Sequence, residues 1–203
     1  MAGGQHERAT TAGAGVIRSP SSSHPIRIEQ VPIEGVAGHL CLTSAPGKRS
    51  PGVVSRVVWD RSLDNALAAL RDQYRSVVLV SLIEDHEFEL LGIPDLVERA
   101  ERRGMRVRRF AIRDVSVPEH DEATAFGDVV EHAYGDLTAG RNVTVHCRGG
   151  GGRAGLVAAF LVVRHGAWAR HTIARVRAAW RGAIETKGQE RLFESFAARM
   201  RHP

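Results

Sequence analysis

The chain has 203 residues, enough for about one domain with a sizeable core, and its hydrophobic content of 43% is ordinary for a globular protein. Its 28 Lys and Arg outnumber its 23 Asp and Glu, a balance that suits anionic ligands. Aromatic residues are few and are not interleaved with the basic ones, so we expect no stacking platform for single strands and no nucleic-acid partner.

The first 25 residues lack the apolar core, roughly 7 to 15 residues long, of a secretory signal. No apolar run approaches the roughly 18 residues that a membrane span needs. Two cysteines, Cys41 and Cys147, are too few for a disulfide framework or a four-ligand zinc site. We therefore expect a cytoplasmic protein without a metal, with a disordered tail over residues 1–25 and one domain over residues 26–203.

Beyond the tail, short apolar runs alternate with segments of helical periodicity. The apolar runs predict strands at 26–33, 39–43, 77–83, 107–112 and 142–146. Helices are predicted at 63–74 behind an N-cap Ser62, from Pro94 in a first turn to about Gly104, and at 120–138, 153–164, 170–180 and 186–200. This alternation predicts an α/β fold with a central, mainly parallel sheet flanked by helices and a helical C-terminal end.

Ligands of such sheets bind where the strands end and the chain turns toward the next helix. Three segments meet this condition, and each is predicted as a loop: "EDHEFE" at 84–89, "RDVSVPEHDE" at 113–122 and "HCRGGGGRAG" at 146–155. The last is the richest in chemistry, because a cysteine precedes four glycines, and an arginine, Arg153, follows them.

The glycines at 149–152 can coil tightly, so that their N–H groups converge on one point beside the start of the next helix. Helix N-termini and nearby cations favour the thiolate form of cysteine, which is the nucleophilic form. Arg153, six positions after Cys147, can reach back across the loop and hold two oxygens of a phosphate. The combination predicts phosphoryl transfer to sulfur.

Two rival interpretations use the same glycines. Gly150, Gly152 and Gly155 also satisfy the G-x-G-x-x-G pattern of dinucleotide-binding domains. That fold needs an acidic residue about 20 positions further on, whereas the first one here is Glu185, and the pattern usually opens the domain. A nucleoside-triphosphate loop is excluded because no Lys-Ser or Lys-Thr follows the glycines.

The stretch "VHCRGGGGRAG" resembles the Cys-x5-Arg signature loop of the protein tyrosine phosphatase superfamily. Further segments resemble its small dual-specificity branch, particularly the cyclin-dependent kinase inhibitor 3-like phosphatases: "LCLTSAPG", "LGIPDL", "AIRDVSVP" and "RGAIETKGQ". Together they cover roughly residues 26 to 200 in the family's order. The resemblance implies a tyrosine phosphatase-like fold and a cysteine-dependent phosphatase without a cofactor.

By this resemblance, Cys147 is the nucleophile, Arg153 the phosphate clamp, and the backbone of Arg148, Gly149, Gly150, Gly151 and Gly152 the cradle. His146 would lie beneath the loop and support its geometry and the thiolate. Asp114 corresponds to the family's general acid.

The reaction requires a general acid independently of the resemblance, because a leaving Tyr, Ser or Thr oxygen needs a proton. Asp114 directly follows a predicted strand and is stiffened by Pro118, so it is the best candidate. The other carboxylates on these loops are alternatives, and for any single one a solvated charge is the competing interpretation: Asp121, Glu119, Glu84, Asp85 and Glu87.

Three further positions carry separate expectations. Residue 154 is Ala where the family usually has Ser or Thr, whose hydroxyl hydrogen-bonds the sulfur, so the second step of turnover is in question. Gln189 resembles the glutamine that orients the hydrolytic water in related phosphatases, although a helical surface glutamine is an equal alternative. Cys41 is expected to pack in the core rather than form a disulfide with Cys147.

The sequence therefore predicts a phosphatase that acts on phosphotyrosine, phosphoserine or phosphothreonine in proteins or peptides, with phosphoinositides as a further substrate class. The alternative is a catalytically weak module that keeps the cradle and binds phosphorylated partners.

Overall fold

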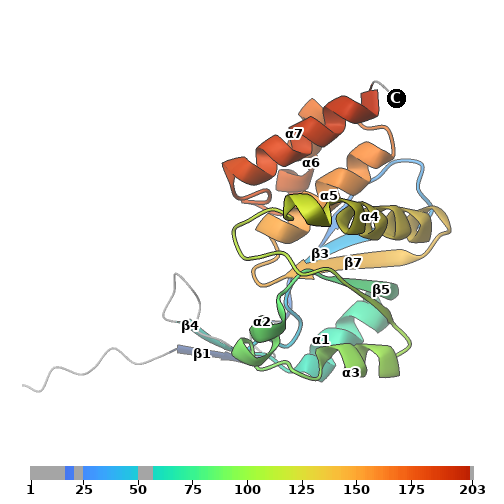
Figure 1. Cartoon of the computed structure of the whole chain (residues 1–203). Coiled ribbons are helices and arrows are strands. Elements are labelled where there is room, and N and C mark those ends of the chain that lie inside the picture. The colour runs from blue at the N-terminus through green and yellow to red at the C-terminus, as the bar shows by residue number, and fades with distance from the viewer. Residues whose placement is uncertain (1–16, 21–24, 50–56, 202–203) are drawn as a thin grey trace, which may run out of the picture.

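The computed structural model describes residues 17–20, 25–49 and 57–201. A five-stranded sheet with strand order β2-β3-β7-β5-β6 forms its centre, with helices on both faces (Figure 1). The strands of this sheet are β2 (Ile28–Val31), β3 (Leu40–Ser44), β5 (Ser76–Ser81), β6 (Arg106–Arg109) and β7 (Asn142–Cys147). Only β2 is antiparallel to its neighbour, which confirms the predicted, mainly parallel α/β sheet.

Helices cover both faces of the sheet, and each face is covered by helices from a different half of the domain. The helices on one face come from the N-terminal half of the domain: α1 (Leu63–Ala68), α2 (Asp85–Leu90) and α3 (Leu96–Arg102). Those on the other come from the C-terminal half: α4 (Ala123–Thr138), α5 (Gly152–Arg164), α6 (Ala169–Ala179) and α7 (Lys187–Arg201). The helical C-terminal end predicted from the sequence is confirmed.

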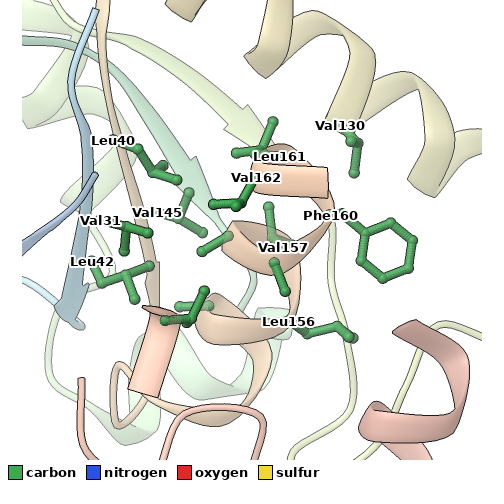
Figure 2. Close-up of a cluster of buried hydrophobic side chains, with 14 of the residues drawn as sticks. Val31, Leu40, Leu42, Val130, Val145, Leu156, Val157, Phe160, Leu161 and Val162 are labelled. Atoms are coloured by element: carbon green, nitrogen blue, oxygen red, sulfur yellow. The ribbon is translucent and has the colours of Figure 1, made fainter. Parts of the chain in front are cut away.

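The helix α5 is the centre of the larger core. Every residue from Gly152 to Val163 is buried, because the sheet lies on one side of α5 and α4, α6 and α7 surround the other. Figure 2 shows how its apolar side chains meet those of the sheet and of α4. The labelled residues are Val31, Leu40, Leu42, Val130, Val145, Leu156, Val157, Phe160, Leu161 and Val162.

A second, smaller core lies on the opposite face of the sheet and contains Cys41, Leu79 and the apolar residues of α1 and α3. Alternation along β3 separates the two cores, because Leu40 and Leu42 point to one face and Cys41 to the other. The prediction that Cys41 packs in the core is confirmed: it is fully buried, and burial, opposed by a hydrogen bond to Thr144, raises the pKa of its thiol to about 11.

Several boundaries differ from the prediction. The helix expected at 63–74 begins after Ser62, whose side chain accepts from Asn65 N, but it turns into a π-helical segment, η1 (Ala69–Gln73). Pro94 precedes α3 instead of lying in its first turn, because Asp95 is the N-cap. The helix expected from residue 120 opens with a 3₁₀ turn, η2 (His120–Glu122). The segment 84–89 is not a loop, since α2 occupies most of it.

The sequence did not predict the two-stranded parallel sheet of β1 (Ile17–Pro20) and β4 (Val57–Asp60). β1 falls within the tail that was expected to be disordered, and residues 1–16 and 21–24 of that tail lie outside the described residues. Within the described part of the chain, no helix is long and apolar enough to cross a bilayer.

Candidate active site

The loop between β7 and α5 carries the candidate nucleophile. Cys147 is the last residue of β7 and is 3% exposed, and its Sγ accepts a hydrogen bond from Gly150 N at 3.2 Å. α5 begins at Gly152, so residues 148–151 connect a strand end directly to a helix N-terminus. The unpaired N–H groups and the dipole of such a helix start favour a bound anion.

The four glycines of this loop are not equivalent. Gly150 has a φ of +91°, and a Cβ there would lie 2.6 Å from Cζ2 of Trp180 and 2.9 Å from Ser44 N. A Cβ at Gly149 would meet no described atom within 4 Å. The buried Trp180 ring therefore supports the loop from one side, and Arg27 lies over that ring at 4.4 Å from its centroid.

The space around Gly150 and Gly149 differs, so alanine substitutions at these two positions should have very different effects on activity. Gly150→Ala should lower kcat/KM for an aryl phosphate by about 10²-fold, because a side chain must displace Trp180 or the β3 backbone and so misplace the reacting groups. Gly149→Ala is the matched control and should stay within about threefold of the wild type. Steady-state kinetics on both variants checks this, and equal losses would mean that the loop requires glycine for another reason.

Arg153 extends from the first turn of α5 into the protein and is 1% exposed. Its Nη1 and Nη2 donate to the two carboxylate oxygens of Glu87 at 2.5 and 3.0 Å, and Nη1 also donates to Ile112 O at 2.9 Å. Burial opposes the charged guanidinium, but the pairing with Glu87 raises the pKa of Arg153 on balance. Its Nε has no hydrogen-bond partner among the described residues, which leaves a buried donor for a ligand.

Glu87 is the buried ion-pair partner of Arg153. It lies in the first turn of α2, is 1% exposed, and accepts from Glu84 N as well as from Arg153. Burial raises its pKa, but the hydrogen bonds from Arg153 and from the Glu84 backbone outweigh this and lower it. Glu87 is therefore an ionised anchor that fixes the arginine, and its interpretation as a solvated loop charge was wrong, because its side chain is buried against Arg153.

Asp114 reaches the same place from the loop after β6. Its Oδ1 lies 2.9 Å from Nη2 of Arg153, and its Oδ2 lies 3.7 Å from Nη1 of Arg148. The Asp114 side chain is 44% exposed, so it lies at the surface of the site while Arg153 lies beneath it. The sequence-predicted acid, cradle and arginine therefore converge in space.

The other acidic candidates lie elsewhere. Glu119 pairs with Arg113 on the outer side of the loop, and Asp85 pairs with Arg109 and is 88% exposed. Asp121 is exposed in η2. The structure therefore separates Asp114 from its alternatives by position, because among the described residues Asp114 pairs with Arg153 and none of these three forms a hydrogen bond or ion pair with Cys147 or Arg153.

His146 and Gln189 are both fully buried. Burial lowers the pKa of His146 to about 3, so its imidazole is neutral at physiological pH. Gln189 is in the first turn of α7, and its amide bonds Ser116 O and Glu185 N. The alternative interpretation of Gln189 as a surface residue is wrong, because its side chain joins two loops instead of facing solvent.

Sequence reasoning did not identify Lys48, in the loop after β3. Its Nζ donates to Arg148 O at 3.3 Å, and burial, followed by the repulsion of Arg61, lowers its pKa to about 8. A signal for it existed, because "APGKR" follows the carboxyl end of β3, the strand next to β7. Lys48 adds positive charge to the outside of the loop.

The likenesses to known proteins agree with this geometry. A family model described as "Polymorphic toxin system, DSP-PTPase phosphatase" matches residues 56–167. No curated protein sequence matches the chain.

Solved structures share the fold. Kinase associated phosphatase, in a form whose catalytic-site cysteine is replaced by serine, matches with a TM-score of 0.76 and 21% identity over 88% of this chain and 98% of that one. Tk-PTP in its active form matches with a TM-score of 0.61 and 24% identity over 84% and 97%. PTPMT1 in complex with PI(5)P matches with a TM-score of 0.64 and 17% identity over 86% and 96%.

These structural likenesses show a tyrosine phosphatase-like fold. Because the family match spans more than half of the chain, the protein belongs to the DSP-PTPase phosphatase family of polymorphic toxin systems, within the protein tyrosine phosphatase superfamily.

Proposed function

We propose that the protein hydrolyses phosphate monoesters through a cysteinyl-phosphate intermediate, with Cys147 as the nucleophile. The observation that supports this best is the meeting of three groups from separate elements. Cys147 Sγ lies inside the glycine loop, Arg153 presents its unpartnered Nε from α5, and Asp114 contacts Arg153 from the loop after β6.

In the first step, Cys147 Sγ forms a bond to phosphorus while the bond from phosphorus to the leaving oxygen breaks. Asp114 gives its proton to that oxygen. In the second step, water attacks phosphorus, Asp114 takes a proton from the water, and the S–P bond breaks. Inorganic phosphate and the thiolate are the products, so the protein returns to its starting state.

Arg153 and the loop N–H groups hold the equatorial oxygens in both steps. In the ligand-free site, the Asp114 carboxylate is already paired with Nη2 of Arg153. A bound phosphate dianion competes for the same guanidinium, so we expect substrate to loosen this ion pair. Once this ion pair is loosened, the Asp114 carboxylate can take up a proton from solvent and give it to the leaving oxygen, while Glu87 keeps Arg153 in place. After the second step Asp114 returns that proton to solvent as phosphate leaves and the ion pair forms again.

The proposed substrates are proteins or peptides that carry phosphotyrosine, phosphoserine or phosphothreonine. Phosphoinositides are a second substrate class, since a protein of the same fold, PTPMT1, has been crystallised with PI(5)P. The cations Arg148 and Lys48 around the loop favour substrates with further negative charge near the scissile phosphate.

The alternative is a module that binds phosphorylated partners with little turnover. Ala154 favours this alternative, because the family usually has a Ser or Thr hydroxyl at this position that assists the second step. Release of phosphate from an aryl phosphate by the wild-type chain decides between the two. Turnover that is abolished in Cys147→Ser supports the enzyme, whereas tight phosphate binding without turnover supports the module.

Ala154 predicts which step limits the rate. It is fully buried beside Arg153. The resemblance implies that a hydroxyl at this position would donate to the sulfur as the thiolate leaves. A charge-assisted hydrogen bond is worth about 1.5 to 3 kcal/mol, or roughly ten- to a hundredfold in rate. We expect the wild type to show a burst of aryl alcohol followed by a slow steady state, and Ala154→Ser to raise the steady-state rate and shrink the burst.

Rapid-quench measurement on both proteins checks this expectation. Ala158→Ser buries a hydroxyl one turn further along the same helix and controls for the cost of burial alone. Absence of a burst in the wild type, together with no gain in Ala154→Ser, would show that another donor already stabilises the sulfur.

A further inference from the structure

The amide of Gln189 bridges two segments that flank the site. Its Oε1 accepts from Glu185 N at 2.8 Å and from Thr186 N at 3.4 Å, and its Nε2 donates to Ser116 O at 2.9 Å. The partners fix the orientation of the amide, because two N–H groups require an oxygen and a carbonyl requires a donor. A residue with both an acceptor and a donor is therefore needed here.

Ser116 belongs to the turn that presents Asp114. Ser116 N donates to Arg113 O, which closes this turn around Asp114 and Val115. Val115 has a φ of +54° and is 58% exposed, so a β-branched residue holds an unfavourable backbone conformation with little packing to stabilise it. The contacts of the neighbouring residues must therefore hold the turn.

Arg153 and, at a longer distance, Arg148 contact the side chain of Asp114, and Gln189 holds the backbone at Ser116. A bound phosphate competes for the two cations, but it does not compete for the Gln189 amide. The Gln189 contact therefore persists while substrate is bound. Gln189 also lies beside the cradle, since a Cβ at Gly152 would be 3.4 Å from its Nε2.

We infer that Gln189 is a positioning residue for the general acid: it holds the Asp114 turn over the glycine loop. This inference rests on the function proposed above. It differs from the role that the resemblance implies, because a glutamine that orients hydrolytic water needs a carbonyl oxygen free to accept from that water. Here Oε1 already accepts from two backbone N–H groups.

Two substitutions separate the contacts of Gln189. Gln189→Glu keeps the size and the acceptor oxygens for Glu185 N and Thr186 N but replaces the donor to Ser116 O by a carboxylate oxygen. Gln189→Met removes both. Glu190→Gln is the control on the next residue of α7, because Glu190 pairs with Arg177 and Lys187 away from the turn.

The measurement is kcat/KM for phenyl phosphate and nitrophenyl phosphate, with and without Asp114→Asn. We expect Gln189→Glu and Gln189→Met to slow phenyl phosphate about tenfold or more, to slow nitrophenyl phosphate less than threefold, and to flatten the basic limb of the pH profile. In the Asp114→Asn background the same substitutions should have almost no effect, since residues that act through one group are not additive. Hydrogen exchange at Val115 and Ser116 should become about tenfold faster in Gln189→Glu, and that of α5 should not change.

Equal losses for both substrates, losses that add to those of Asp114→Asn, or a steady state that is slower relative to the burst than in the wild type would overturn the inference and assign Gln189 to the water step. If Asp114→Asn itself discriminates between the substrates and the Gln189 variants do not, the inference alone fails. If Asp114→Asn shows no discrimination, the proposed acid fails and the inference with it.

Discussion

Cys147→Ser should lower the turnover of an aryl phosphate by about 10⁴-fold or more while phosphate binding stays within a few fold of the wild type. Loss of a catalytic nucleophile has an effect of this order because no other group takes its place. The glycine loop and Arg153 are unchanged in this variant, and the smaller oxygen fits where sulfur accepts from Gly150 N. The anion site therefore persists without its reactive atom.

Steady-state kinetics and titration calorimetry with inorganic phosphate check the two halves of this expectation. Cys41→Ala is the matched control, because it removes the other cysteine from the opposite face of the sheet and should leave kcat unchanged. Residual activity above a few per cent in purified Cys147→Ser would show that the thiolate mechanism is wrong.

Asp114→Asn should slow poor leaving groups such as phenolate or an alkoxide by roughly 10²- to 10⁴-fold and slow nitrophenolate much less. An amide cannot donate a carboxyl proton, although its oxygen can still accept from Val115 N as the carboxylate does. The basic limb of the pH profile should flatten, because that limb reports the deprotonation of the acid, and the acidic limb should persist.

The control for this prediction is Asp121→Asn, which removes an exposed carboxylate of the same connection. Its kcat/KM values should match those of the wild type for both substrates. Equal losses for good and poor leaving groups in Asp114→Asn would exclude Asp114 as the acid and leave Asp121 to be tested in that role.

Local patterns predicted most of the fold. The apolar runs that became β3, β5 and β7 and the periodic segments that became α4 to α7 are buried as their spacing indicated. The segment "EDHEFE" was predicted as a loop because it is rich in acidic residues and too short to show helical periodicity, although α2 occupies most of it. Its helical signal is the spacing of Glu84 and Glu87, where the side chain at the third helical position bonds the backbone that starts the helix.

The glycine loop of the candidate site could be recognised from the sequence, whereas the residues that support it could not. Cys147 and Arg153 are six residues apart, so one motif contains both. Glu87 is 66 positions from Arg153 in the sequence, so their ion pair forms only in the folded chain. Trp180 is the last position of the helix predicted at 170–180, and only the folded chain shows that its ring lies against Gly150. Contacts of this kind depend on tertiary structure and leave no local pattern.

The positions of the two cysteines have a consequence for oxidative damage. Peroxide converts a reactive thiolate to a sulfenic acid, which a second thiol in reach traps as a disulfide before it reaches the irreversible sulfinic state. Cys41 is the only other cysteine in the sequence, and the sheet separates it from Cys147. An oxidised Cys147 therefore depends on an external thiol, or on a neighbouring backbone nitrogen, for its recovery.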